Sequence, residues 1–237
     1  MRRRFFVEKF ENDRAVMEGD AAYHLGRVLR AEPGQVYELS DGSAVWLGQI
    51  EQVGRDRIEF ALTEPVPAYV PRLQTTLLLS VVKFDAFEWA LEKATELGAT
   101  RIVPLAAARS EKSLLAAAPK RAERWRKILL ESSQQSRRVQ VPVLGALTKP
   151  EEGFSMVAVD LRILFSERPD APSLRDSLAG GRPDSVALAI GPEGGWTDGE
   201  LDLARSTGFR EVSLGKLILR AETAVVTALS IVNFALE

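Results

Sequence analysis

The residues of this chain best suited to chemistry lie in three short segments, one of them rich in glycine and another containing a single glycine. Ile190-Gly191-Pro192-Glu193-Gly194-Gly195 and Leu164-Phe165-Ser166-Glu167-Arg168 each follow an apolar run, and a third segment runs from Leu214-Gly215 to Ala224. Glycines allow close backbone approach and leave amides and carbonyls free for a ligand. Because ligands of open α/β sheets bind beyond the carboxyl ends of the strands, we expect the three segments to meet at one site.

The pattern of these glycines restricts the kind of ligand. It is neither GxGxxG nor a P-loop, and no acidic residue stands at the spacing expected for a dinucleotide ribose. A pyrophosphate ligand is therefore disfavoured, and an adenine ring or a methionine moiety fits better. Taken alone, Ile190-Gly191-Pro192-Glu193-Gly194-Gly195 is equally explained as a plain turn between a strand and a helix.

Two absences narrow the chemistry further. The chain has no cysteine, which excludes disulfides, thiolate metal sites and cysteine nucleophiles. Its single histidine, His24, supports neither a multi-histidine metal site nor a Ser-His-Asp triad, so we expect no metal. His24 is interpreted as a structural residue or an RNA contact.

Charge is distributed unevenly along the chain, although the net charge is only −2. Residues 101–149 carry 11 Lys and Arg against 3 Asp and Glu, a net of +8, whereas residues 151–237 carry 8 against 14, a net of −6. The basic stretch is either a solvated helix or a face for an anionic partner. Its few compensating acids favour a nucleic acid.

The elements that must position these residues form two parts. In residues 1–70, Val36–Ser40 and residues 44–53 read as strands joined by an Asp41-Gly42 turn, a third strand covers 57–62, and a short helix covers 20–29. This pattern predicts a small β-barrel. Pro65, Pro67 and Pro71 read as a stiff linker.

Residues 71–237 alternate between strands and helices, which predicts an α/β domain with a mostly parallel sheet. Strands are expected at 75–82, 101–105 and 186–190. Capping boxes are expected at Asp85 with Glu88 and at Thr197 with Glu200, and Gly98 and Gly208 are expected to end the two helices. The last helix is apolar over much of its girth, so it is buried either in the core or against a partner.

Two motifs resemble a known family. Gly191-Pro192-Glu193-Gly194-Gly195, followed by Ser213-Leu214-Gly215-Lys216-Leu217-Ile218-Leu219-Arg220-Ala221-Glu222-Thr223-Ala224, is similar to the signature of the ribosomal RNA small subunit methyltransferase E family, in the SPOUT or trefoil-knot superfamily. The resemblance extends to Arg3-Arg4-Phe5-Phe6-Val7, Lys93-Ala94-Thr95-Glu96-Leu97-Gly98, Arg109-Ser110 and Gln135-Ser136-Arg137-Arg138. It therefore covers nearly the whole chain.

The resemblance implies a PUA-like RNA-binding barrel at 1–70 and a knotted methyltransferase domain at 71–237. It implies a homodimer that uses S-adenosylmethionine to methylate N3 of one uracil (uracil-1498) in 16S ribosomal RNA of the small subunit. The expected cofactor residues are Leu164, Phe165, Glu167, Ile190, Gly191, Pro192, Gly194, Gly195, Leu214, Gly215, Leu219, Arg220, Thr223 and Ala224.

Uracil N3 must lose its proton before it attacks the methyl group, so a cation or a base is needed nearby. Arg220 is expected to bind uracil O2 or O4, or else a phosphate, and Glu222 is expected either to act as base or to favour the start of the last helix. The candidate RNA contacts are Arg2, Arg3, Arg4, Arg27, Arg30, Lys83, Arg109, Lys112, Arg137 and Arg138.

The chain departs from the family pattern at Phe84, Ala86 and Gln134, which puts RNA contacts in doubt rather than the methyl donor.

Three alternative functions stay open: a ribose 2′-hydroxyl methyltransferase, an RNA-binding assembly factor without catalysis, and a dinucleotide enzyme. No segment approaches the ~20 apolar residues of a membrane span, and the N-terminal apolar run is too short for a signal peptide. The expected location is the cytoplasm.

Overall fold

The computed structural model describes residues 3–178 and 180–237, and these divide into two compact units. The first unit contains the described residues up to Val70 together with Ser133–Val141, and the second contains Pro71–Ser132 and Pro142–Glu237. Each unit has its own hydrophobic core. The segment Ser133–Val141 is thus separated in sequence from the rest of the unit to which it belongs.

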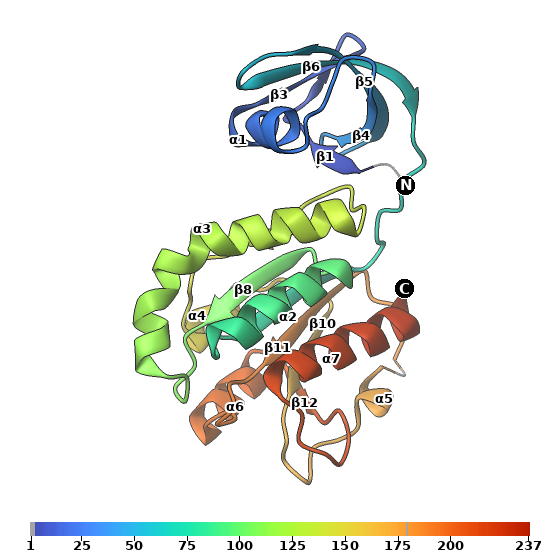
Figure 1. Ribbon diagram of the computed structural model, residues 1–237. Coiled ribbons are helices and arrows are strands. Elements are labelled where there is room, and N and C mark those ends of the chain that lie inside the picture. The colour runs from blue at the N-terminus through green and yellow to red at the C-terminus, as the bar shows by residue number, and fades with distance from the viewer. Residues whose placement is uncertain (1–2, 179) are drawn as a thin grey trace. The chain divides into compact units, whose positions relative to one another are not determined.

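The first unit is a curled, mixed sheet of six strands (Figure 1). In chain order the strands are β1 (Arg4–Phe6), β2 (Phe10–Glu11), β3 (Arg14–Glu18), β4 (Val36–Ser40), β5 (Val45–Val53) and β6 (Arg57–Pro65). Their spatial order is β1-β4-β5-β6-β3-β2, and only the β1–β4 pair is parallel. The predicted β-rich unit is confirmed, as a curled sheet.

Local sequence signals explain the turns of this unit. The Asp41 carboxylate accepts hydrogen bonds from the amides of Ser43 (2.8 Å) and Ala44 (2.9 Å), which closes the predicted hairpin between β4 and β5. The expected helix over 20–29 is instead a short helix α1 (Gly19–Tyr23) that continues as a π-helical turn, η1 (His24–Val28). Strand β6 extends through Pro65, one of the prolines assigned to the linker.

The second unit is an all-parallel sheet with helices on both faces. Its elements are β7 (Gln74–Ser80), α2 (Phe84–Glu96), β8 (Arg101–Leu105), α3 (Lys112–Gln135, of which the last three residues fall in the first unit), β9 (Val143–Leu144), α4 (Pro150–Met156), β10 (Leu161–Phe165), α5 (Leu174–Ser177), β11 (Ser185–Ile190), α6 (Asp198–Ser206), β12 (Arg210–Val212) and α7 (Ala221–Leu236). The strand order is β12-β10-β11-β7-β8-β9. The predicted α/β class is confirmed.

Apolar strands explain why both faces of this sheet are covered. In β7 and β11 nearly every side chain is buried, as expected for central parallel strands. Helices α4 and α6 pack on one face, and α7 packs against β11 and beside α2 (Figure 1). No helix among the described residues is long and apolar enough to cross a membrane.

Of the two predicted capping boxes, one is confirmed and the other is wrong. The Thr197 hydroxyl accepts from the Glu200 amide (3.2 Å), and the Glu200 carboxylate accepts from the Thr197 amide (2.8 Å). Helix α2, by contrast, begins at Phe84 after Lys83 and has no side-chain cap. Its Glu88 is buried and pairs with Arg124 of α3 (Nε to Oε2, 2.7 Å), so a tertiary ion pair replaces the local cap.

Candidate active site

The three segments singled out in the sequence meet at the carboxyl edge of the parallel sheet. They follow β10, β11 and β12, which are neighbours in the sheet, and together they line a cavity of about 490 Å³. Of the expected cofactor residues, those that line it are Phe165, Glu167, Ile190, Gly191, Pro192, Gly195, Leu214, Gly215, Leu219, Arg220 and Ala224. The predicted meeting of the loops is confirmed.

The other three expected cofactor residues lie elsewhere. Leu164 is buried in the core beneath the sheet edge, Thr223 is exposed on α7, and Gly194 lies in the turn beside Arg109. Further lining residues were not among the expected ones, although several fall inside the quoted motifs: Arg109, Ser166, Arg168, Glu193, Trp196, Asp198, Leu201, Ser213, Lys216, Leu217, Ile218 and Ala221. Trp196, directly after Gly195, could have been noticed from its position alone.

Trp196 forms the rigid base of the cavity. Trp196 is 7% exposed, and its Nε1–H donates to the carbonyl oxygen of Phe165 at the end of β10 (3.0 Å). A Cβ atom at Gly191 would lie 3.1 Å from Cε2 and Nε1 of this ring. Gly191 is therefore required because the indole fills the space that a side chain would occupy.

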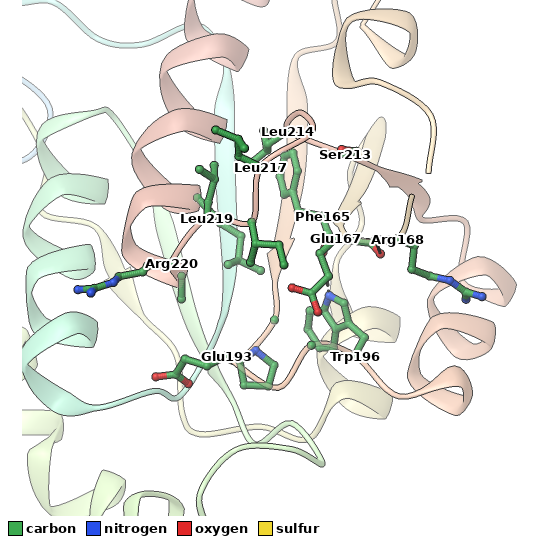
Figure 2. Close-up of a pocket in the computed structure, with 18 of the residues that line it drawn as sticks. Phe165, Glu167, Arg168, Glu193, Trp196, Ser213, Leu214, Leu217, Leu219 and Arg220 are labelled. Carbon is green, nitrogen blue, oxygen red and sulfur yellow. Dashed lines mark hydrogen bonds between the residues drawn. The ribbon is translucent and has the colours of Figure 1, made fainter. Parts of the chain in front are cut away.

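The second loop is a tight turn from Pro192 to Gly195. The Gly195 amide donates to the Pro192 carbonyl (2.8 Å), and Gly195 has a φ of +69°, which disfavours other residues. A Cβ atom there would lie 3.0 Å from Oε1 of Glu167. Figure 2 shows the Glu167 carboxylate directed toward Trp196, whereas Glu193 projects away from the turn.

The third loop is held by a local hydrogen-bond pair. The Ser213 hydroxyl donates to the Gly215 carbonyl (2.8 Å) and accepts from the Gly215 amide (3.1 Å), while Gly215 adopts a φ of +141°. Beyond it, Leu217 and Ile218 are 82% and 79% exposed. The loop thus presents apolar side chains at the cavity without burying them in the core.

The charged side chains around the cavity differ in their ion-pair partners and in whether they point into the cavity. Arg168 lies within 3.9 Å of Asp170 and 3.7 Å of Asp198, and Figure 2 shows its guanidinium directed away from the cavity. Arg220 is the exposed residue just before the first turn of α7, makes no side-chain cap, and its side chain also extends outward (Figure 2). Glu222 lies in the first turn of α7 and does not line the cavity. Among the described residues, no cluster of His, Asp and Glu could hold a metal ion.

The expected RNA contacts fall into several environments. Arg3, Arg27, Arg30, Lys83 and Lys112 have exposed side chains, and Arg2 lies outside the described residues. The Arg109 guanidinium is engaged with the backbone of the second loop. Burial lowers the pKa of the Arg138 guanidinium to about 10.

Arg4 and Arg137 meet at a buried carboxylate of the first unit. Glu38, whose side chain is 4% exposed, accepts from Arg4 Nη2 (2.8 Å) and Nε (3.0 Å) and also binds the guanidinium of Arg137. Burial, and then the charge of Arg137, lowers the pKa of Arg4. Arg4 is itself 3% exposed, so it lies in the core rather than on a surface open to RNA.

Comparisons with known proteins agree with this architecture. The family model of the RNA methyltransferase domain matches residues 70–233. The ribosomal RNA small subunit methyltransferase E of Synechocystis is 36% identical over 219 residues, covering 91% of this chain and 71% of the relative. The enzyme of the same name from Mycobacterium bovis is 31% identical and covers 92% of this chain and 86% of the relative.

Two solved structures extend the likeness to three dimensions. A ribosomal RNA small subunit methyltransferase E from Neisseria gonorrhoeae, bound to S-adenosyl methionine, has a TM-score of 0.88 at 27% identity and covers 100% of this chain and 98% of its own. A methyltransferase from Legionella pneumophila with bound SAM also scores 0.88, at 28% identity, and covers 99% and 98%. The fold and loops define an RNA methyltransferase domain of the SPOUT, or trefoil-knot, class. The chain belongs to the ribosomal RNA small subunit methyltransferase E family.

Proposed function

We propose that this protein transfers the methyl group of S-adenosylmethionine to N3 of one uracil, uracil-1498, in 16S ribosomal RNA of the small subunit. The observation that carries the proposal is the cavity formed by the loops after β10, β11 and β12 in a chain of this family. The Neisseria and Legionella structures, which span the same length of chain, hold S-adenosylmethionine.

The residues around the cavity fit this cofactor. A volume of about 490 Å³ lies within the range of small-molecule sites, ~300–1,000 Å³. Phe165, Leu214 and Leu219 provide apolar walls for an adenine ring, and glycines expose backbone groups. The Glu167 carboxylate suits ribose hydroxyls or a positive charge. When bound, S-adenosylmethionine supplies an electrophilic methyl group on a sulfonium.

We assign Arg220 to the substrate side of this site. It lines the cavity, yet its guanidinium extends outward, where the oxygens of a uracil or a phosphate would approach (Figure 2). A cation there would stabilise the negative charge left when N3 loses its proton. Glu222 is assigned to the start of α7, because a carboxylate in the first turn favours the positive end of a helix.

The RNA surface is proposed to use residues whose cationic groups are exposed: Arg3, Arg27, Arg30, Lys83 and Lys112. Such groups supply the phosphate-binding and salt-sensitive part of affinity. In this proposal residues 1–70 act as a PUA-like RNA-binding domain and residues 71–237 as the catalytic domain, with Ser133–Val141 contributed to the former. The protein acts in the cytoplasm on the small subunit.

A homodimer formed through α7 completes the proposal. Helix α7 buries one side against its own unit but leaves Phe234 93% exposed and Ile231 37% exposed. Trp89 of the neighbouring helix α2 is 44% exposed. An apolar helix face of this kind favours a second copy of the chain as its occupant.

The test is transfer of label from S-adenosylmethionine to small ribosomal subunits that lack the modification. Large subunits and fully modified small subunits serve as controls, and calorimetry measures cofactor binding separately. We expect binding of S-adenosylmethionine and label in the unmodified small subunits alone. Cofactor binding without label in any RNA would contradict the substrate, and absence of cofactor binding would favour an RNA-binding factor without catalysis.

A further inference from the structure

The segment between β8 and α3, residues 106–111, makes hydrogen bonds to the loop after β7, to the loop after β11 and to helix α6. The Ala108 amide donates to Oε1 of Glu200 (2.9 Å), and the Ser110 hydroxyl donates to the Val81 carbonyl (2.7 Å). Between them, Nη1 of Arg109 donates to the carbonyls of Gly194 (2.8 Å) and Trp196 (3.2 Å). The segment therefore supports the loop that follows β11.

Arg109 lies along this loop over its whole length. A Cβ atom at Gly194 would lie 3.1 Å from Cβ and 3.4 Å from Cδ of Arg109, and one at Gly195 would lie 3.9 Å from its Nη1. The guanidinium thus bridges two carbonyls on either side of Gly195. Both hydrogen bonds come from the one nitrogen Nη1, which the planar guanidinium holds between the two carbonyls.

We propose that Arg109 is a positioning residue that holds the Pro192–Gly195 turn in the conformation lining the cavity, and so sets affinity for S-adenosylmethionine. The inference rests on the proposed function of that cavity. It gives Arg109 a role distinct from RNA contact, because Nη1 of its guanidinium donates to two backbone carbonyls of the loop after β11.

The physical reason is the flexibility of the turn without this anchor. Gly194 and Gly195 have wide conformational freedom, and the single turn hydrogen bond from Gly195 to Pro192 does not fix the Gly194 and Trp196 carbonyls. When only a fraction of molecules is competent to bind, the apparent Kd rises by the inverse of that fraction. A fall of the competent fraction to a tenth weakens binding about tenfold.

The experiment compares Arg109→Ala, Arg109→Lys and Arg175→Ala in the full chain. Arg175 is an exposed arginine of α5 in the same unit, away from the cavity, and controls for loss of a positive charge. Calorimetry gives the Kd for S-adenosylmethionine, and methylation kinetics give KM for each substrate. Hydrogen exchange of the peptide covering residues 191–197 reports the loop directly.

We expect Arg109→Ala to weaken cofactor binding about tenfold, with faster exchange in residues 191–197 and an unchanged KM for the small subunit. Arg109→Lys should recover part of the affinity, because an ammonium can donate to the same carbonyls but is carried on a more flexible side chain. Unchanged cofactor affinity with a raised KM for the subunit would overturn the inference in favour of RNA contact. If the unaltered protein bound no S-adenosylmethionine, the proposed function itself would fail, so the two failures are distinguishable.

Discussion

Replacing Gly191 by alanine tests whether the Trp196 ring defines the cavity. The new Cβ would lie 3.1 Å from two atoms of a buried indole that is hydrogen-bonded to Phe165. No left-handed backbone conformation is required at Gly191, so the predicted effect is steric alone. Gly199→Ala is the matched control, because a Cβ there has no atom within 4 Å and alanine favours the helix.

The expected magnitudes follow from packing and hydrogen bonding. Overpacking at Gly191→Ala should lower the free energy of unfolding by about 1–3 kcal/mol. Trp196→Phe leaves the Phe165 carbonyl without its donor and loses packing, so it should cost about 2–4 kcal/mol. In the double variant, the smaller ring is no longer fixed by its hydrogen bond and can move aside. The two losses should therefore fall short of additivity by about 1 kcal/mol or more.

Urea unfolding followed by circular dichroism measures the four stabilities of this cycle, and calorimetry measures cofactor affinity in parallel. Gly199→Ala should leave the stability equal or slightly higher. Strict additivity of Gly191→Ala and Trp196→Phe, or a Gly191→Ala variant as stable as the Gly199→Ala control, would refute the steric reasoning.

Three further outcomes are expected. Glu38→Gln leaves Arg4 charged and buried, so it should lower the free energy of unfolding, measured by urea denaturation, by about 3–5 kcal/mol. The control Glu59→Gln removes an exposed ion pair with Arg57 and should lower it by less than about 1 kcal/mol. Equal losses in the two variants would contradict this reasoning. Phe234→Asp should convert a dimer to a monomer in light scattering at micromolar concentration, and a monomeric unaltered protein would remove the dimer proposal. RNA affinity should fall steeply with salt, with Lys112→Ala reducing the logarithmic slope by roughly one, and an unchanged slope would exclude a phosphate contact there.

Features determined by nearby residues were predictable from the sequence. The Thr197–Glu200 capping box forms because both partners lie within one helical turn. The meeting of the three loops followed from a rule of parallel sheets, since the carboxyl ends of β10, β11 and β12 share one edge. The glycine-containing segments after β11 and β12, together with the segment after β10, therefore predicted where the cavity lies.

Features determined by distant residues were not predictable in this way. Glu88 has the spacing of a capping residue, but Arg124, 36 residues away, binds it instead. The buried environment of Arg4 depends on Glu38, and the membership of Ser133–Val141 in the first unit depends on contacts such as that between the Ser40 hydroxyl and the Val139 carbonyl (2.7 Å), 99 residues apart. Periodicity and motif spacing carry no information about such pairs.

Two further residues, one lining the site and one on α2, show the same limit. Arg109 belongs to a basic stretch and is predicted to contact RNA, and the sequence gives no sign that its Nη1 donates to two backbone carbonyls. Phe84, a departure from the family pattern, packs edge-on against Trp125 with ring centroids 6.1 Å apart and lies under the guanidinium of Arg121. Both assignments require knowledge of which helices and loops become neighbours.

The central claim, methylation at uracil N3, is tested most directly by nucleoside mass spectrometry of small-subunit RNA after reaction with S-adenosylmethionine. The proposal predicts N3-methyluridine at a single position of the 16S ribosomal RNA, absent when the protein is omitted. A methyl group on a ribose 2′-hydroxyl, or on another base, would keep the fold and the cofactor site but contradict the assigned reaction.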